Sequence, residues 1–355
     1  MSEISERFTG TKPVDERLAF DAGALEEYMR QNVEGFSGDL EVRQFKGGQS
    51  NPTYMLSAGG TNYVLRRKPP GKLLPSAHAV DREYRVITAL ARTDVPVART
   101  YALCEDESVI GTMFYIMECV EGRVFWELGL PEQDKAERTA IYDAANDVIA
   151  RLHNVDYEAI GLSDYGRPGN YFARQISRWT KQYQASETET IDAMNSLIEW
   201  LPENIPPGDE TTIVHGDYRL DNMIFHPTEP RVLAVLDWEL GTLGHPLGDF
   251  AYHCMSWRIP TGLFRGLAGL DLEALGIPTE EQYVAAYCRR TGRDGIDNWA
   301  FYMAYNMFRL AGIAQGIVGR VRDGTAASQH ATEMDARVRP LAEMGWAEAQ
   351  KVING

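Results

Sequence analysis

A polar loop and a later acid are the residues of this chain whose types and spacing could carry chemistry. Asp217 and Asn222 lie five residues apart in one loop, and Asp237 follows an apolar run twenty residues after Asp217. Phosphoryl transfer needs a carboxylate that orients and accepts the proton of the attacking hydroxyl, and oxygen ligands for the magnesium that bridges the nucleotide phosphates. These three side chains supply such groups.

Each of the three residues also has a purely structural interpretation. An Asp in a loop commonly forms a turn or caps a helix, and Asp237 could simply end a strand. Their joint order favours chemistry, because Asp217 and Asn222 have the same offset as the Asp and Asn of the protein-kinase catalytic loop. Asp237 likewise ends its apolar run as the acid of a DFG motif does.

The chain resembles the aminoglycoside phosphotransferase and choline kinase family, whose signature H-G-D-x-x-x-x-N is followed by an apolar strand ending in Asp. The segments YVLRRKPPGKLLPSAHAVDREYRV and LDWELGTLGHPLGDFAY are also similar to the kinase-like domain fused to some acyl-CoA dehydrogenases, and to its free-standing bacterial relatives. The resemblance implies that Asp217 is the catalytic base, that Asn222 and Asp237 bind Mg²⁺, that His215 buttresses the loop, and that Asp249 braces it.

The resemblance also implies an α+β, two-lobed protein-kinase-like fold. We expect an N-terminal nucleotide-binding lobe over residues 1–120, with an antiparallel sheet and a helix, and a mostly helical catalytic and acceptor-binding lobe over residues 121–355. The dipeptide Glu121-Gly122 marks the predicted boundary.

Hydrophobic periodicity predicts the elements that position these residues. In the first lobe the pattern predicts helices over Ala24–Asn32 and Ser76–Arg92, the second capped by Ser76, and strands over Gln44–Leu56, Thr61–Arg67, Thr100–Leu103 and Met113–Cys119. In the second it predicts helices over Glu132–His153 and Ala326–Gly355, and short strands over Thr211–His215, Met223–Phe225 and Val232–Leu236. Ala58-Gly59-Gly60 predicts a hairpin turn.

The first lobe should bind ATP. The loop between its first strand-like runs contains Gly48, Ser50 and Asn51, where backbone amides could approach phosphates, although it matches no phosphate-loop signature and could be a plain turn. In kinases a strand cation clamps the phosphates and is held by a helix Glu. Arg66 and Glu83 occupy those places.

Arg66 departs from the family pattern, which usually has Lys at this position. Arg67 and Lys68 are adjacent and compete for the same role. A guanidinium group can fork onto phosphate oxygens and stays charged, so Arg is chemically adequate. The departure also keeps open a catalytically silent nucleotide-binding or scaffold domain.

The run from Met113 to Val120 resembles the strand and hinge that pair with adenine. Met117 occupies the gatekeeper position, and Glu118 to Val120 form the hinge. The side chains there leave open whether ATP or GTP is preferred.

The acceptor is expected to meet C-terminal helices near Thr279–Asp323. Residues 280–355 contain nine Lys or Arg and nine Asp or Glu, so this segment has no excess of negative charge that would favour binding of a polycation. An anionic or neutral hydroxyl compound, such as a hydroxy acid or a hydroxyacyl-CoA, would suit contacts from Arg309, Arg320, Tyr302, Tyr305 and Asn306. Aromatic residues at this helical spacing, however, more often pack in the core. An aminoglycoside, choline-like or sugar kinase remains the alternative.

Composition narrows the class of protein. A net charge of −16 disfavours nucleic acid as a partner, and four scattered cysteines indicate neither a zinc site nor a disulfide framework. The cysteine pattern favours a reducing cytoplasm. No run of eighteen apolar residues and no signal-like N-terminus is present, which disfavours secretion and membrane spanning. The oligomeric state stays open.

Overall fold

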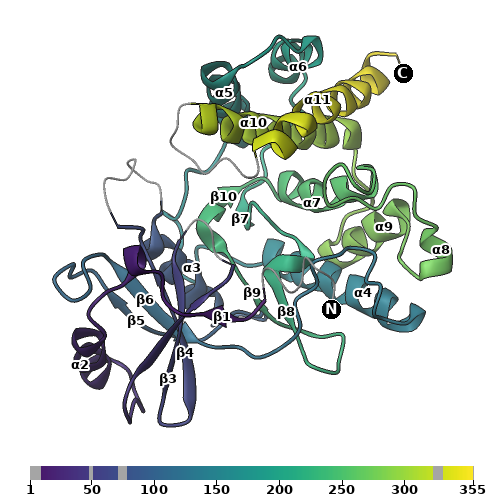
Figure 1. Ribbon diagram of the computed structural model, residues 1–355. Coiled ribbons are helices and arrows are strands. Elements are labelled where there is room, and N and C mark those ends of the chain that lie inside the picture. The colour runs from purple at the N-terminus through teal and green to yellow at the C-terminus, as the bar shows by residue number, and fades with distance from the viewer. Residues whose placement is uncertain (1–8, 48–50, 71–77, 323–330, 355) are drawn as a thin grey trace. The chain divides into compact units, whose positions relative to one another are not determined.

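The computed structural model describes residues 9–47, 51–70, 78–322 and 331–354 (Figure 1). The described residues form two compact units, each assembled from separate stretches of chain. Unit 1 draws on Met1–Trp126, Asp156–Tyr165 and Arg219–Gly241. Unit 2 draws on Glu127–Val155, Gly166–Tyr218 and Thr242–Gly355. These discontinuous units differ from the contiguous lobes 1–120 and 121–355, which remain a prediction.

Unit 1 is built around a six-stranded sheet in the order β1-β2-β3-β4-β6-β5, in which every neighbouring pair is antiparallel. Its strands are β1 (Thr11–Lys12), β2 (Glu41–Phe45), β3 (Thr53–Ala58), β4 (Thr61–Arg67), β5 (Thr100–Cys104) and β6 (Phe114–Glu118). Its helices over the same stretch are η1 (Glu16–Leu18), α2 (Ala22–Asn32) and α3 (Val80–Leu90). The predicted hairpin turn is confirmed, because Ala58 pairs with Thr61 and the intervening Gly59 and Gly60 have φ of +57° and +80°.

The two faces of this sheet have different partners. Side chains alternate across a strand, so Leu65 and Arg66 of β4 point to opposite faces. Leu65 packs in the buried cluster that includes Leu25 and Met29 of α2. Arg66 lies on the other face, which also carries Val64 and contributes to a cavity. The register of β4 therefore decides which side chain can reach a ligand.

A second small hairpin completes unit 1. Strands β8 (Met223–Phe225) and β9 (Val232–Val235) pair antiparallel, with the short helices η2 (Leu220–Asn222) before β8 and η3 (Trp238–Leu240) after β9. Met223 pairs with Val235, and the Leu236 amide donates to the Asn222 carbonyl at 2.8 Å. Asn222 and Asp237 are thereby held at the same end of the hairpin.

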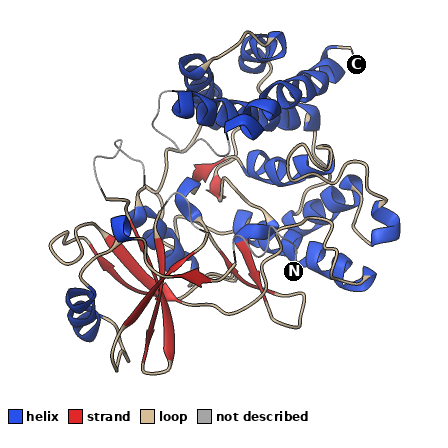
Figure 2. Ribbon diagram, viewed as in Figure 1, coloured by secondary structure: helices blue, strands red, loops and turns tan. Residues whose placement is uncertain are grey.

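Unit 2 is mostly helical, with one short strand pair (Figure 2). Its helices are α4 (Lys135–His153), α5 (Tyr171–Ser186), α6 (Asp192–Glu203), α7 (Pro246–Cys254), η4 (Met255–Trp257), α8 (Leu272–Leu275), α9 (Glu280–Thr291), α10 (Trp299–Arg322) and α11 (Ala331–Ile353). The strand pair joins β7 (Thr212–Val214) to β10 (Thr242–Gly244). Helix α10 packs against α5, α7 and α11, and its Tyr305 and Phe308 are fully buried.

The predicted fold class is confirmed: the protein is α+β, with an N-terminal antiparallel sheet and a helical C-terminal region. The single predicted strand Gln44–Leu56 was wrong, because strand β2 ends at Phe45 and a second strand, β3, begins at Thr53. The predicted cap Ser76 lies outside the described residues. Among the helices that the structure describes, none is long and apolar enough to cross a lipid bilayer.

Candidate active site

Unit 1 contains a cavity of about 310 Å³ between the α3-facing side of the sheet and the β8–β9 hairpin. One part of its wall is apolar, with Val64, Ile87, Ala98, Met117, Val120, Ile224 and Val235 among the lining residues. Another part is polar and is lined by Arg66, Asp221, Asn222 and Asp237. A cavity with an apolar wall and a few convergent polar groups is typical of a small-molecule site.

Arg66 is the cation among the described residues that line this cavity, and it is paired with three acids, of which Glu239 is the most distant at 3.7 Å. Its Nε lies 2.8 Å from Oε2 of Glu83, and its Nη2 donates to Oδ1 of Asp237 at 2.5 Å. Burial by itself would lower the pKa of the Arg66 guanidinium, but Glu83 and Asp237 raise that pKa above its usual value. The group is therefore a permanent positive charge with only 10% of its side chain exposed.

The structure separates Arg66 from the two competing cations. Arg67 lies on the opposite face of β4, where its Nη2 donates to the Leu18 carbonyl at 2.8 Å. Its guanidinium also stacks over the rings of Phe20 and Tyr54, at 5.0 and 5.4 Å from their centroids. Neither Arg67 nor Lys68 lines the cavity. Of these three cations, only Arg66 can meet a molecule bound in it.

Glu83 is held in place by a buried polar network. Asn51 donates to its Oε1 at 2.7 Å, and the Tyr115 hydroxyl donates to its Oε2 at 3.2 Å. Asn51 is fully buried, and its Oδ1 lies 2.9 Å from Nδ1 of His78. The Asn51 side chain therefore orients Glu83 and, contrary to expectation, does not line the cavity.

The remaining residues of the predicted phosphate loop are only partly described. Gly48 and Ser50 lie outside the described residues, whereas their neighbour Gly47 lines the cavity. Their proposed contact with phosphates remains a prediction.

The predicted hinge lines the apolar part of the cavity. Strand β6 ends at Glu118, and Met117, Glu118 and Val120 all contribute to the wall. Gly122 follows, and a Cβ atom there would lie 2.1 Å from the Phe225 carbonyl oxygen. Only glycine allows the chain to pass this close to strand β8.

Asn222 and Asp237 meet at the polar part of the cavity. Asp237 has φ of +63° and ψ of +59°, in the left-handed region that costs most residues free energy but that Asn and Asp tolerate best. This backbone conformation ends strand β9 and turns the chain into η3. Sequence reasoning missed Asp221, a buried acid that also lines the cavity; its place next to Asn222 in the motif is the only signal that pointed to it.

The residues at this end fit a magnesium ion. Among the described residues, no group of three or more His, Cys, Asp or Glu side chains could hold a metal. Magnesium, however, is commonly bound by one or two protein oxygens together with substrate phosphates. The Asn222 amide and the Asp237 carboxylate offer such oxygens, and Arg66 offers a charge for the phosphates.

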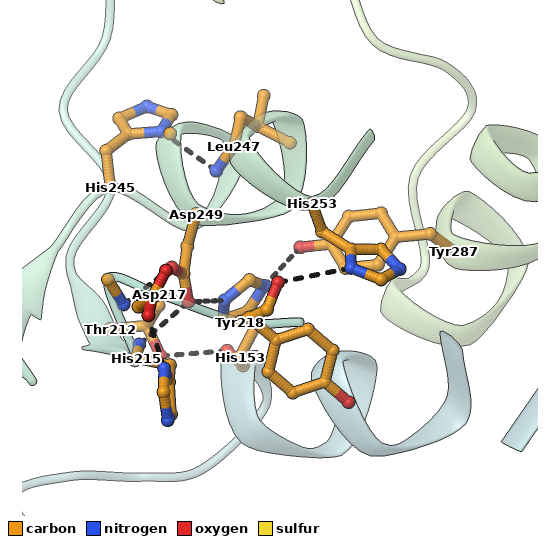
Figure 3. A network of polar contacts seen from close by, with 12 residues as sticks. His153, Thr212, His215, Asp217, Tyr218, His245, Leu247, Asp249, His253 and Tyr287 are labelled. Carbon is orange, nitrogen blue, oxygen red and sulfur yellow. Dashed lines mark hydrogen bonds and ion pairs between the residues drawn. The ribbon is translucent and has the colours of Figure 1, made fainter. Parts of the chain in front are cut away.

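Asp217 belongs to unit 2, where its loop follows strand β7 (Figure 3). The Asp217 amide donates to Nδ1 of His215 at 3.2 Å, so His215 buttresses the loop as expected. The carboxylate of Asp249 accepts hydrogen bonds from the backbone amides of His215 and Gly216, both at 2.8 Å. The predicted bracing by Asp249 is confirmed.

Asp249 is fully enclosed and stays charged. Burial by itself would raise the pKa of this carboxyl, but hydrogen bonds from His153 and from the loop amides lower it below its usual value. His153 is fixed in turn by the Tyr287 hydroxyl, which lies 2.7 Å from its Nδ1 (Figure 3). The charged carboxylate can therefore hold the loop amides at neutral pH.

Two further side chains contact the Asp217 loop. The Tyr252 hydroxyl donates to Oδ1 of Asp217 at 2.6 Å, and Nη2 of Arg309 donates to the Gly216 carbonyl at 2.6 Å. Arg309 was expected to meet the acceptor, but it is 5% exposed and bound to the loop instead. Tyr305 and Asn306 are fully buried as well, so these residues of α10 belong to the core of unit 2. Tyr252 carried no signal in the sequence.

Comparison with known proteins gives consistent matches. Residues 41–305 match the Phosphotransferase enzyme family. Acyl-CoA dehydrogenase family member 10 of Mus musculus is 47% identical over 344 residues, which are 96% of this chain but only 32% of that protein. The chain thus spans about a third of the length of this relative.

Solved structures of phosphotransferases are also similar to this chain. A provisionally named aminoglycoside phosphotransferase from Ralstonia eutropha has 64% identity and a TM-score of 0.87, over 94% of this chain and 99% of that one. A thermostable mutant of aminoglycoside phosphotransferase APH(4)-Ia, in a ternary complex with AMP-PNP and hygromycin B, has 17% identity and a TM-score of 0.58, over 91% and 99%. At that identity the second likeness shows the fold alone.

Proposed function

Because this chain belongs to the phosphotransferase enzyme family, we propose that it is an ATP-dependent, magnesium-requiring O-phosphotransferase acting on the hydroxyl group of a small molecule. The observation that carries the proposal is that Arg66, Asn222 and Asp237 line the polar part of a cavity whose other lining residues are mostly apolar. Such a cavity suits a molecule with a flat apolar base and a charged phosphate tail.

The nucleotide part of the proposal rests on unit 1. The wall around Met117 and Val120 would receive the base, and the backbone beyond Glu118 leaves the strand pairing and could pair with its edge. Arg66 would bind the phosphates, held by Glu83. The AMP-PNP complex of the APH(4)-Ia neighbour supports ATP as the nucleotide.

The metal part of the proposal rests on the hairpin end. Asn222 and Asp237 would hold Mg²⁺, which neutralises charge on the phosphate oxygens when bound. Arg66 is paired with Asp237, so a bound nucleotide would draw the guanidinium toward its phosphates and leave the carboxylate for the ion.

Asp217 would serve as the base. The acceptor oxygen forms a bond to the γ-phosphorus, the bond from that phosphorus to the β,γ-bridging oxygen breaks, and the acceptor proton passes to the Asp217 carboxylate. The ground for a shared role of Asp217 and Asn222 is their five-residue offset, which is that of the Asp and Asn of the protein-kinase catalytic loop.

We propose a hydroxy acid or a hydroxyacyl-CoA as the acceptor. The likeness to acyl-CoA dehydrogenase family member 10 favours a substrate of acyl metabolism, although this chain matches only 32% of that protein. The equal numbers of basic and acidic residues over 280–355 argue against a polycationic aminoglycoside.

A catalytically silent nucleotide-binding domain is the second candidate. The specific observation in its favour is the ion pair that occupies both Arg66 and Asp237. In that case nucleotide would bind without transfer of phosphate.

One experiment separates the two candidates. The protein is incubated with Mg-ATP and separate hydroxy acids, hydroxyacyl-CoA thioesters, amino alcohols, sugars and aminoglycosides. ADP release and the mass of each acceptor are followed for the wild type, for Asp217→Ala and for the exposed-acid control Asp143→Ala. Phosphorylated product from the wild type and Asp143→Ala, but not from Asp217→Ala, supports the proposal. No product with any acceptor, despite measurable ATP binding, supports the silent domain.

A further inference from the structure

The Asp217 loop is held by more than the expected Asp249 brace. Tyr252 and Asp249 both lie on α7, and Arg309 lies on α10. Asp249 accepts two backbone amides of the loop, whereas Arg309 donates to the Gly216 carbonyl between them and Asp217. Donors and acceptors on two helices thus fix the backbone that leads into Asp217.

The Asp217 side chain has its own anchor. The Tyr252 hydroxyl donates a 2.6 Å hydrogen bond to Oδ1, and hydrogen bonds to an ionised acceptor are among the stronger ones in proteins. Tyr252 is 4% exposed, so its ring cannot swing into solvent.

Arg309 also restricts the Tyr252 ring. Its guanidinium carbon lies 4.8 Å from the centroid of Tyr252 and 5.7 Å from that of Trp179 on α5. The cation is therefore stacked against two rings while its Nη2 holds Gly216. One side chain positions both the loop backbone and the ring that contacts Asp217.

We propose that Tyr252 and Arg309 are positioning residues, which act through Asp217 by fixing the direction of its carboxylate. The inference rests on the proposed function, in which this carboxylate takes the acceptor proton. A misplacement of about 1 Å in such a group can lower the rate about 100-fold. Neither residue is expected to touch ATP.

The test compares Tyr252→Phe with Tyr142→Phe. Tyr142 is also buried, and its hydroxyl donates a hydrogen bond to the Leu128 carbonyl at 2.7 Å. Tyr142→Phe therefore removes a similar hydrogen bond elsewhere in unit 2. We expect Tyr252→Phe to lower kcat about 10- to 100-fold while KM for ATP changes less than about twofold. Tyr142→Phe should leave kcat within about twofold of the wild type.

A double variant examines whether Tyr252 acts through Asp217. In an Asp217→Asn background, Tyr252→Phe should change the residual rate less than about twofold, because a group that acts through another loses its effect when the other is removed. An equal loss in both backgrounds would overturn the proposal.

A second measurement does not depend on activity. Hydrogen exchange of the amides of residues 215–217 should become about tenfold faster in Tyr252→Phe and in Arg309→Met, and should be unchanged in Tyr142→Phe. Unchanged exchange in Tyr252→Phe, or faster exchange with unchanged kcat, would overturn the positioning role. If the wild type phosphorylates no acceptor, the proposed function fails, and the exchange rates alone decide whether Tyr252 fixes the loop.

Discussion

Arg66 and Asp237 are 171 residues apart in the chain and form an ion pair with 2.5 Å between Nη2 and Oδ1. The same guanidinium contacts Glu83 through Nε at 2.8 Å. One cation thus joins strand β4, helix α3 and the end of the β8–β9 hairpin within unit 1. A lysine has a single ammonium and could not fork to both acids in the same way.

Removing this cation should weaken nucleotide binding. We expect Arg66→Met to raise the Kd for AMP-PNP about 10- to 100-fold, because a charge-assisted contact with phosphate is lost. Arg66→Lys should stay within about tenfold of the wild type. Titration calorimetry measures both. The neighbouring variant Arg67→Met is the control, since Arg67 faces away from the cavity and should affect stability rather than Kd. Equal losses for Arg66→Met and Arg67→Met would contradict the assignment.

Variants of the proposed metal ligands should differ from a variant of the proposed base in how much Mg-ATP raises their Tm. Mg-ATP is expected to raise the Tm of the wild type about 5 °C above that in ATP with EDTA. Asn222→Ala and Asp237→Asn should lose most of this difference, whereas Asp217→Ala should keep it. Asn tolerates the left-handed backbone of Asp237, so the second variant removes charge without adding strain. Equal shifts in all three variants would count against these roles.

Glu83 should contribute strongly to the stability of unit 1. In Glu83→Ala the buried Arg66 loses one of its acidic partners, and the Asn51 side chain loses its hydrogen-bond acceptor. We therefore expect the free energy of unfolding to fall by about 3 kcal/mol. Asp81→Ala on the same helix should cost less than about 1 kcal/mol. Urea unfolding followed by circular dichroism measures the difference. A similar cost for the two variants would show that the Glu83 network is not required.

Two buried histidines should make stability depend on pH. Burial lowers the pKa of His245 and that of His253 to about 4, whereas an unfolded chain has imidazole pKa values near 6.5. Between these values the unfolded state binds protons that the folded state excludes. The free energy of unfolding should therefore fall as pH falls from about 6.5 to about 4, by up to about 3 kcal/mol for each histidine.

Urea titrations at several pH values, followed by tryptophan fluorescence, test this dependence. His253→Gln removes one titrating group and should flatten the slope, since its amide can still meet the Tyr218 carbonyl and the Tyr283 hydroxyl. The same slope in the variant and the wild type would contradict the assignment to His253.

Local patterns predicted most elements of the fold. The Gly59-Gly60 turn and the periodic apolar residues of α3 and α4 are short-range features, and they appear where expected. Apolar alternation predicts one strand over Gln44–Leu56, because this pattern does not reveal where one strand ends and the next begins. The end of β2 and the start of β3 depend on pairing with β1 and β4, which lie elsewhere in the chain.

The amino-acid sequence by itself determined the polar motif Asp217–Asn222, the acid Asp237 and the glycine turn, because each depends on residue type and spacing along the chain. Tertiary structure alone decided that Arg66 faces the cavity while Arg67 contacts Leu18 and Phe20 on the other face of the sheet, and that Arg309 holds the Asp217 loop rather than an acceptor. Adjacent side chains on a strand point to opposite faces, but which face meets a cavity depends on packing partners distant in the sequence.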